Sequence, residues 1–283
     1  MKSITYIFSI LFVLTIFSCS DDNDDNPEDL NKEIEGLIKV TEISNDEHII
    51  EIYSTQAKLY QGYNELTLRI VDKLTDEFIT NATLNWMPVM HMTDKNHSCP
   101  KSEISKVAGM KTTYEGFIIF QMAGMMNQGW DLTFNYDVDG NSYTAVGDID
   151  VMMSEKQVVT VFTGTDDVRY ILALIEPSDP EVKVNDMFAG LYKMESMMSF
   201  PVVKNFSIEL DPRMPSMGNH SSPNNEDLVY DASQENYQGK LSLTMTGYWK
   251  LNLRLMNENS EVLKGELVTE ENESSSLYLE IEF

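Results

Sequence analysis

The fold is decided by Trp130-Asp131-Leu132-Thr133-Phe134-Asn135-Tyr136, a stretch in which an apolar residue occupies every second position. A period of two places these side chains on one face of a β-strand. A second alternating stretch follows at residues 142–146. Between the two lies Asp139-Gly140, a dipeptide suited to the positive φ angles of a tight hairpin. The sequence here therefore predicts a β-hairpin with one face on a core.

Alternation of this kind continues on both sides of the hairpin, and no stretch of the first half shows a long helical period. Turn residues separate about seven such segments in each half, a pattern typical of a β-sandwich. The sequence therefore predicts an all-β protein. Further strands are expected at residues 48–53, 65–71, 82–86, 116–120 and 158–162, and then at 170–174, 190–194, 206–210, 239–245, 248–253, 262–268 and 277–283.

Two segments share a pattern and hold three of the four histidines. The first contains Met87-Pro88-Val89-Met90-His91-Met92 and Asn96-His97-Ser98-Cys99-Pro100, and the second contains Met214-Pro215-Ser216-Met217 and Asn219-His220-Ser221-Ser222-Pro223. A tyrosine stands 17 positions after His97 and after His220, a glycine follows two positions later, and a methionine stands eight positions after each tyrosine. These residues are Tyr114, Gly116 and Met122, and Tyr237, Gly239 and Met245. Shared offsets over this length indicate a duplicated domain.

The duplication predicts two domains of about 120 residues, each large enough for its own core. The segment Thr163-Gly164-Thr165-Asp166-Asp167 is polar and poor in hydrophobic residues, so we expect the boundary there. The first domain is expected at residues 37–164 and the second at residues 165–283.

The N-terminus has the features of a targeting segment. Lys2 precedes an apolar stretch that closes with Leu14-Thr15-Ile16-Phe17-Ser18-Cys19, which resembles a bacterial lipobox. We therefore predict a lipoprotein signal peptide at residues 1–18 and acyl chains, such as palmitate, on Cys19. The alternative is an ordinary secretory peptide with a chance cysteine.

An acidic, polar run follows Cys19 and predicts a flexible tether at residues 19–36. It resembles the surface-export signal of some Gram-negative lineages, although any charged spacer would serve as a tether. The expected location is the bacterial cell envelope, with the protein anchored in the outer membrane and facing the periplasm or the surface.

The charge balance excludes some classes of partner. Removal of residues 1–18 would leave 19 basic residues against 46 acidic ones, since only Lys2 is lost. A surface so negative repels nucleic acid and anionic lipid, so neither is an expected partner. After lipidation of Cys19, Cys99 is the one remaining thiol, so no internal disulfide is expected.

The order of motifs in each half resembles the YtkA-like domain. A strand is followed by Met-Pro-x-Met, then by a histidine, and then by a Tyr-x-Gly strand that leads to a strand containing tryptophan. That family is a small Ig-like sandwich of secreted and membrane-anchored bacterial proteins, and it is similar to the FixH-like and CopC-like copper-handling families. The resemblance covers roughly residues 55–160 and 185–283. It is closer in the second half, where Asn219 is inserted before His220, than in the first, where His91 follows Met90 directly. It implies two tandem Ig-like sandwiches that handle copper.

The candidate copper ligands lie in the two repeated segments. They are Met87, Met90, His91, Met92 and His97 in the first, and Met214, Met217 and His220 in the second. Thioethers favour Cu(I), and imidazole accepts either oxidation state of copper. We expect the prolines to end each strand, so that these residues meet in loops at one end of each sandwich. The alternative is packing, because this chain has 18 methionines and methionine fills irregular gaps.

A catalytic site is not expected. Cys99 follows His97 closely, but the second repeat has Ser222 at the equivalent position, and no third residue is placed to orient a Cys–His pair. No phosphate loop, nucleotide fingerprint or zinc-protease motif is present. The leading hypothesis is a non-enzymatic, lipid-anchored envelope protein that binds copper or passes it on. The alternative is a structural or interaction module at the cell surface, which would bind an envelope protein and no metal.

Overall fold

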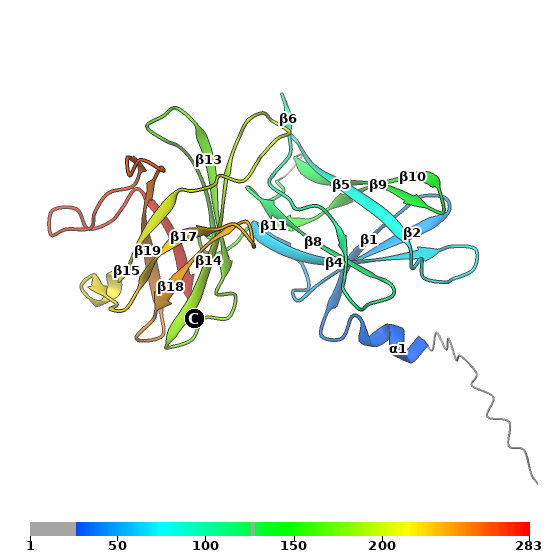
Figure 1. The fold of residues 1–283 in the computed structure, drawn as a ribbon, viewed down its shortest axis with the longest axis horizontal. Helices are drawn as coiled ribbons and strands as arrows, with labels where there is room; N and C mark the ends of the chain where they lie inside the picture. Colours follow the sequence, from blue (N-terminus) through cyan, green and yellow to red (C-terminus); the bar gives the residue numbers. More distant parts are fainter. Residues whose placement is uncertain (1–26, 126–127) are drawn as a thin grey trace, which may run out of the picture.

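In the computed structural model, which describes residues 27–125 and 128–283, the chain folds almost entirely into β-strands. Figure 1 shows two β domains side by side, the first coloured blue to green and the second green to red. The helices of the described residues are α1 (Pro27–Lys32) and the 3-10 helix η1 (Pro215–Met217). The expected all-β class with sandwich architecture is confirmed.

The first domain is built from two antiparallel sheets and one short parallel pair. The sheets have the strand orders β1-β2-β4-β8-β7 and β10-β9-β5-β6, and the parallel pair is β3 with β11. Apolar side chains from both sheets form one buried cluster between them. The strands are β1 (Ile38–Ser44), β2 (His48–Ser54), β3 (Leu59–Tyr60), β4 (Gly62–Asp72), β5 (Ala82–His91), β6 (Asn96–His97), β7 (Ser105–Lys106), β8 (Thr113–Phe120), β9 (Gly129–Val138), β10 (Asn141–Ile149) and β11 (Val151–Met152).

The hairpin predicted from alternation is β9 and β10, which pair in register from Val138 and Asn141 outward. At the turn, Asp139 has φ 50° and Gly140 has φ 80°, so both adopt the positive values that a tight hairpin requires. Every second residue of β9 is buried, from Trp130 through Tyr136. The alternation therefore places one face of the hairpin on the core of the first domain.

The second domain is one continuous sheet with its own buried cluster. The main path is β12-β13-β14-β18-β17-β15-β19-β20, with β16 on β15 and β21 on β19. β17 pairs with both β18 and β15 and so joins the two sides of the sandwich. The strands are β12 (Val159–Thr163), β13 (Arg169–Glu176), β14 (Val184–Lys193), β15 (Ser207–Met214), β16 (His220–Ser221), β17 (Glu226–Asp231), β18 (Asn236–Ser242), β19 (Tyr248–Met256), β20 (Val262–Lys264) and β21 (Leu277–Glu282).

The strand order of the first domain recurs in the second. The order β1-β2-β4-β8 is repeated as β12-β13-β14-β18, and β10-β9-β5-β6 is repeated as β21-β19-β15-β16. The repeated tyrosines have matching roles. Tyr114 accepts a hydrogen bond from the Ala82 N–H at 2.9 Å, and Tyr237 donates to the Val203 carbonyl at 3.0 Å, so each ties its strand to the opposite sheet close to β5 or β15. This repeated topology supports the duplication.

The domain boundary differs from the expected one. β12 was expected to close the first domain, but it pairs with β13 along its whole length, and the turn between them contains residues 164–168. The polar segment at residues 163–167, where the boundary is expected, is therefore part of a hairpin inside the second domain. Turns and linkers share a polar composition, so composition alone does not separate them. The crossing from one domain to the other lies before Val159.

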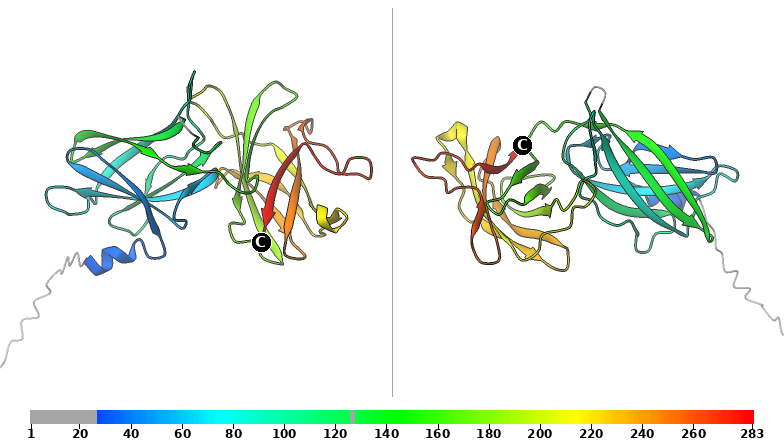
Figure 2. Two further views of the ribbon diagram at one scale, coloured as in Figure 1. Left: turned by 180° about the vertical axis from the view of Figure 1, so that it is seen from behind. Right: turned by 90° about the horizontal axis from the view of Figure 1, so that it is seen from above.

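The two domains meet through an apolar contact. Tyr63 and Ile119 of the first domain join Val159, Ile171 and Tyr192 of the second in a cluster separate from both cores. Figure 2 shows, from behind and from above, that the two domains lie next to each other. The apolar cluster therefore fixes the two sandwiches against each other where β4 and β8 approach β13.

The predicted signal peptide, Cys19 and the first part of the tether lie outside the described residues. The rest of the expected flexible tether, residues 27–36, contains helix α1 and a turn. Glu33 fixes this segment to the first domain, because its carboxylate accepts hydrogen bonds from the backbone N–H groups of Lys111 at 2.7 Å and Thr112 at 2.9 Å. Among the described residues, no helix has the length and hydrophobicity to span a membrane.

Candidate functional site

The strand register corrects the alignment of the two repeats. Met90 is the cross-strand partner of His97, and Met214 is the partner of His220, so Met90 corresponds to Met214. Pro88 faces Leu132 and Pro212 faces Leu251 in the neighbouring strand. The segment equivalent to Met87-Pro88-Val89-Met90 is therefore Asp211-Pro212-Arg213-Met214. It begins three residues before the expected Met214-Pro215-Ser216-Met217.

The first Met-Pro segment is a strand rather than a loop. β5 runs on from Trp86 to His91, and Pro88 does not end it. β5 has β9 on one side, while β6 covers only Met90 and His91 on the other, so most of β5 is a sheet edge. An edge strand tolerates proline because its missing N–H is not needed for a second ladder. The expectation that Pro88 ends the ladder was wrong for this reason.

The alternation of β5 separates the first set of candidate ligands. Met90 is buried in the core, whereas Met87 and His91 lie on the opposite face of the strand. Met87 and His91 are four residues apart on that face, which corresponds to about 13 Å along an extended strand. The five residues of the first set therefore do not converge on one point.

The outer face carries a histidine–carboxylate pair. His91 Nε2 is hydrogen-bonded to Asp131 Oδ2, and the His91 side chain is 50% exposed. Asp131 lies opposite Val89 in β9, so it shares this face of the sheet. Met87 is too far along the strand to join this pair, so His91 stands apart from the other soft donors.

His97 lies on the inner side, where it is held in one orientation. Its Nδ1 is 2.8 Å from the carbonyl oxygen of Ser98, and its ring meets the Trp130 ring edge-on, with centroids 5.5 Å apart. A carbonyl only accepts, so Nδ1 carries the proton and Nε2 of the neutral ring keeps its lone pair. A histidine fixed in this way through its other nitrogen is the usual arrangement of a metal ligand.

Ser98 connects three of the methionine and histidine residues. Its carbonyl accepts from His97, its hydroxyl approaches Met87 Sδ at 3.5 Å, and its N–H donates to the Met197 carbonyl at 2.8 Å. Ser98 is fully buried. Met197 belongs to the second domain, so the residue after His97 is bonded directly to the other half of the chain.

Beside His97 lies a cavity of about 420 Å³ between the two domains. Met92 and Met122 line it from the first domain, together with His97, and no Asp or Glu is among its lining residues. The structure thus brings together Met92 and His97 of the predicted set. It adds Met122. The sequence identifies Met122 as a residue of the repeat but does not predict that it lies beside the same cavity as His97.

The methionines of the repeat have a backbone role in both domains. The Trp130 indole donates to the Met122 carbonyl at 3.0 Å, and the Trp249 indole donates to the Met245 carbonyl at 3.0 Å. A carbonyl contact does not require a particular side chain. The thioether of Met122 is therefore not needed for the hydrogen bond to Trp130.

The second predicted set does not form a site. Met214 is buried in the core of the second domain, Met217 lies in η1 and is 56% exposed, and His220 is exposed. The left-handed Gly218, with φ 64°, ends η1 and turns the chain away from it. These residues do not fit a shared metal ion.

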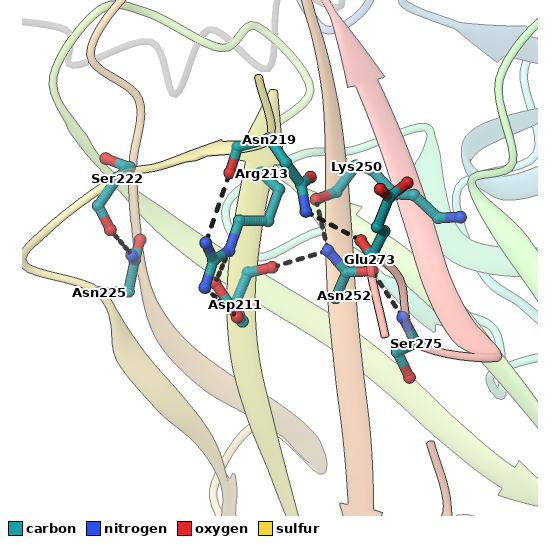
Figure 3. A network of polar contacts seen from close by, with 9 residues as sticks. All are labelled: Asp211, Arg213, Asn219, Ser222, Asn225, Lys250, Asn252, Glu273 and Ser275. Atoms are coloured by element: carbon teal, nitrogen blue, oxygen red, sulfur yellow. Dashed lines mark hydrogen bonds and ion pairs between the residues drawn. The ribbon is translucent and has the colours of Figure 1, made fainter. Parts of the chain in front are cut away.

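A polar network occupies the corresponding face of the second domain, as Figure 3 shows. Arg213 donates to both carboxylate oxygens of Asp211, at 2.7 and 2.9 Å, and to the Asn219 carbonyl at 3.3 Å. Asn219 in turn donates to the Glu273 carbonyl at 2.9 Å. Asp211 and Arg213 stand where the first domain has Met87 and Val89. This face therefore holds the loop of His220 in place and offers no soft donor.

Cys99 is not a reactive thiol. It is buried in the core of the first domain, and burial raises the pKa of the Cys99 thiol well above its usual value. A nucleophilic or metal-binding cysteine acts as the thiolate, which this environment disfavours. In residues 27–125 and 128–283, no three His, Cys, Asp or Glu side chains are grouped so as to hold a metal ion.

Comparison with known proteins gives distant likenesses only. No model of a protein family and no curated protein matches the chain. Among solved structures, the Escherichia coli adhesin FdeC is 12% identical with a TM-score of 0.26, over 78% of this chain and 64% of that one. A conserved domain protein from Bacillus anthracis is 9% identical with a TM-score of 0.31, over 89% of this chain and 93% of that one. The chain thus spans less than two thirds of the adhesin structure, and neither likeness bears on function.

Proposed function

We propose that the protein is a non-enzymatic, lipid-anchored protein of the bacterial cell envelope that binds Cu(I) beside His97. In this proposal its two domains are YtkA-like sandwiches, the first of which carries His97, Met92 and Met122. The second domain does not carry a copper loop of its own. The protein holds copper or passes it to an envelope partner.

The orientation of His97 is the observation that carries this proposal. Its Nδ1 is committed to the Ser98 carbonyl, and the residue lines a cavity together with Met92 and Met122. Met90, its cross-strand partner, packs directly behind it in the core. Soft thioether donors with one imidazole form a ligand set that suits Cu(I).

The charges around the cavity disfavour multiply charged metal ions. Lys95 and Arg169 are exposed residues in its lining, and no carboxylate is among the lining residues. Hard ions such as Ca²⁺ and Mg²⁺ need carboxylate and carbonyl oxygens. Lys95 and Arg169 repel any bound cation, and they repel a singly charged ion such as Cu(I) least, because repulsion grows with the charge of the ion.

Anchoring is proposed from the N-terminal sequence. Leu14 to Cys19 resembles a lipobox, and the acidic run that follows provides a spacer before α1. Two or more acyl chains on Cys19 would give stable membrane attachment. The negative charge of the chain opposes attachment through anionic lipid, so the acyl chains would carry the whole binding energy.

A surface interaction module without metal is the second candidate. The observation that favours it is the separation of the predicted ligands, because Met87 and His91 lie on the opposite face of β5 from Met90. In that case the methionines beside His97 would serve as packing between domains. An enzyme is not proposed, since the one thiol of the folded domains is buried.

Titration with Cu(I) in competition with a coloured chelator tests the proposal on the mature protein. His97→Asn keeps a donor toward the Ser98 carbonyl but lacks Nε2, so it should lose tight binding. The matched control is His91→Asn, which alters the outer face of β5 and does not touch Ser98 or the cavity, so it should bind as the wild type does. Absence of binding by the wild-type protein at micromolar free Cu(I) would leave the interaction module as the better proposal.

A further inference from the structure

We infer that the second domain completes the copper site, because Met194 and Met197 reach the same interdomain cavity as Met92, His97 and Met122. This inference rests on the proposed function and names further donors for the same site. It makes the site a property of the tandem pair, since neither domain alone carries all five side chains. Copper would then join the two sandwiches.

The cavity is lined from both sides. Met194 directly follows β14, and Met197 lies in the connection between β14 and β15. Both line the cavity of about 420 Å³ that His97 also lines. Thus four methionines and one histidine, drawn from three separate segments of the chain, line a single cavity.

The backbone holds the two second-domain methionines in position. The Met194 N–H donates to the Arg169 carbonyl at 2.8 Å, which extends the β13–β14 pairing by one residue. Glu195 donates to the Ser199 carbonyl at 3.0 Å, and the Ser196 hydroxyl accepts from the Met198 N–H at 3.2 Å, so residues 195–199 form a closed turn. The tip of this turn is bonded to Ser98, beside His97. The turn is therefore preorganised against the first domain.

Two adjacent methionines of this turn have different surroundings. Met197 is half-buried and lines the cavity, whereas Met198 is 44% exposed and does not line it. Met198 provides a control that has the same chemistry and lies one residue away.

Packing is the competing role, and it can be separated from ligation. Met194 packs against the apolar cluster between the domains. Leucine has nearly the volume of methionine, and such exchanges are usually well tolerated in packed sites. Leucine has no donor atom. A Met→Leu change therefore keeps most of the packing and removes only the thioether.

The test uses the full mature chain and the double variant Met194→Leu/Met197→Leu, with Met198→Leu as the matched control. Cu(I) affinity is measured by chelator competition, and sulfur neighbours of the bound ion are counted by X-ray absorption. The double variant should bind at least about tenfold more weakly, a loss at the level seen when the support of a metal site is removed. Its X-ray spectrum should show fewer sulfur neighbours, while Met198→Leu should match the wild type.

Two other results would overturn the inference and are distinguishable. If the wild type binds Cu(I) and the double variant binds equally well with the same number of sulfur neighbours, the site lies in the first domain alone and the proposed function stands. If the wild type does not bind Cu(I), both proposals fail together. A circular dichroism spectrum and melting curve of the double variant without copper, close to those of the wild type, confirm that any loss of affinity is not a loss of fold.

Discussion

The backbone N–H of Ser98 donates to the carbonyl oxygen of Met197 at 2.8 Å, across the boundary between the two domains. Ser98 is fully buried, so this hydrogen bond is shielded from water. The same residue accepts the His97 Nδ1–H, and therefore the orientation of the imidazole depends on a peptide that the second domain helps to hold. The tandem arrangement thus affects the candidate site directly, beyond placing two similar sandwiches in one chain.

Cys99→Ser should destabilise the first domain without changing copper binding. The thiol is buried in the apolar core, and a hydroxyl there would be left without a partner, at a cost of about 1–3 kcal/mol. Ser222, its positional counterpart, already has a buried hydroxyl with no hydrogen-bond partner among the described residues. Urea denaturation followed by tryptophan fluorescence measures the loss. A drop in Cu(I) affinity with unchanged stability would instead make Cys99 a ligand.

The repeated Tyr-x-Gly glycines should not tolerate alanine, and the second should tolerate it least. A Cβ on Gly239 would lie 2.5 Å from the Glu226 carbonyl oxygen, which is backbone and cannot move aside easily. A Cβ on Gly116 would lie 2.8 Å from the Trp86 ring and 3.1 Å from the nearest backbone atom, the Glu103 carbonyl oxygen, so its closest approach to backbone is less severe. We expect losses of about 3 kcal/mol or more for Gly239→Ala and about 1–3 kcal/mol for Gly116→Ala.

Gly140→Ala is the control for these two changes. The hairpin glycine has φ 80° and open space around it, so alanine there meets conformational strain alone, about 1–2 kcal/mol. All three variants are compared by urea denaturation of the full chain. If Gly239→Ala were no worse than Gly140→Ala, steric contact would not be the reason for the repeated glycine.

Glu33 should release the α1 segment in acid. Burial raises the pKa of Glu33, but hydrogen bonds from the Thr112 hydroxyl and from the Lys111 and Thr112 amides outweigh this and lower it overall. A lowered pKa in the folded state means that the carboxylate stabilises docking fully above its unfolded pKa of about 4.3. This stabilisation is lost as the pH falls through the lower folded value. Hydrogen exchange of the Lys111 and Thr112 amides, corrected for intrinsic rates, should therefore rise below about pH 4.

Glu33→Ala should produce the same release at neutral pH. Removal of the acceptor for three hydrogen bonds should ease local opening by about 1–2 kcal/mol, since the group is partly screened by solvent. The protection factors of the two amides, which are corrected for intrinsic exchange rates, would then be lower at pH 7 and would no longer change with pH in the acidic range. Protection in the β9–β10 hairpin serves as the internal reference.

Cys19→Ala tests the anchor independently of the folded domains. Without the thiol, acyl chains cannot be attached, so the protein should leave the membrane fraction or accumulate as an uncut precursor. Fractionation with and without detergent, together with the mass of the N-terminal peptide, gives the result. Unchanged fractionation and mass would mean that Leu14 to Cys19 is not a lipobox.

The all-β fold was predictable because alternation is a local property. The buried face of the β9–β10 hairpin can be identified from the residues of its own strands, and the turn can be identified from Asp139-Gly140. The boundary was not predictable in the same way. A polar turn inside the β12–β13 hairpin and a polar linker between domains have the same composition, and only the pairing of Val159 with Ala173 tells them apart.

The site was predictable only in part, because ligand convergence depends on register. The second half contains two overlapping x-Pro-x-Met segments, at Asp211 and at Met214, and the sequence favours the second because it repeats methionine. The structure aligns the first through the pairing of Met214 with His220. The approach of Met197 to Ser98 joins residues nearly a hundred positions apart, and no local pattern contains that information.

Copper stoichiometry is the prediction that most directly separates the two views of the repeat. Two equivalent loops would bind two ions per chain, whereas the register and burial of Met214, Met217 and His220 leave one site. We expect one Cu(I) per chain. Met217→Leu with His220→Asn should leave both the number and the affinity unchanged, since these exposed side chains do not meet. Chelator-competition titration with metal analysis of the desalted protein measures both quantities. Two ions per chain, with one lost in the double variant, would restore the second loop as a site and would require Met217 to move toward His220 on binding.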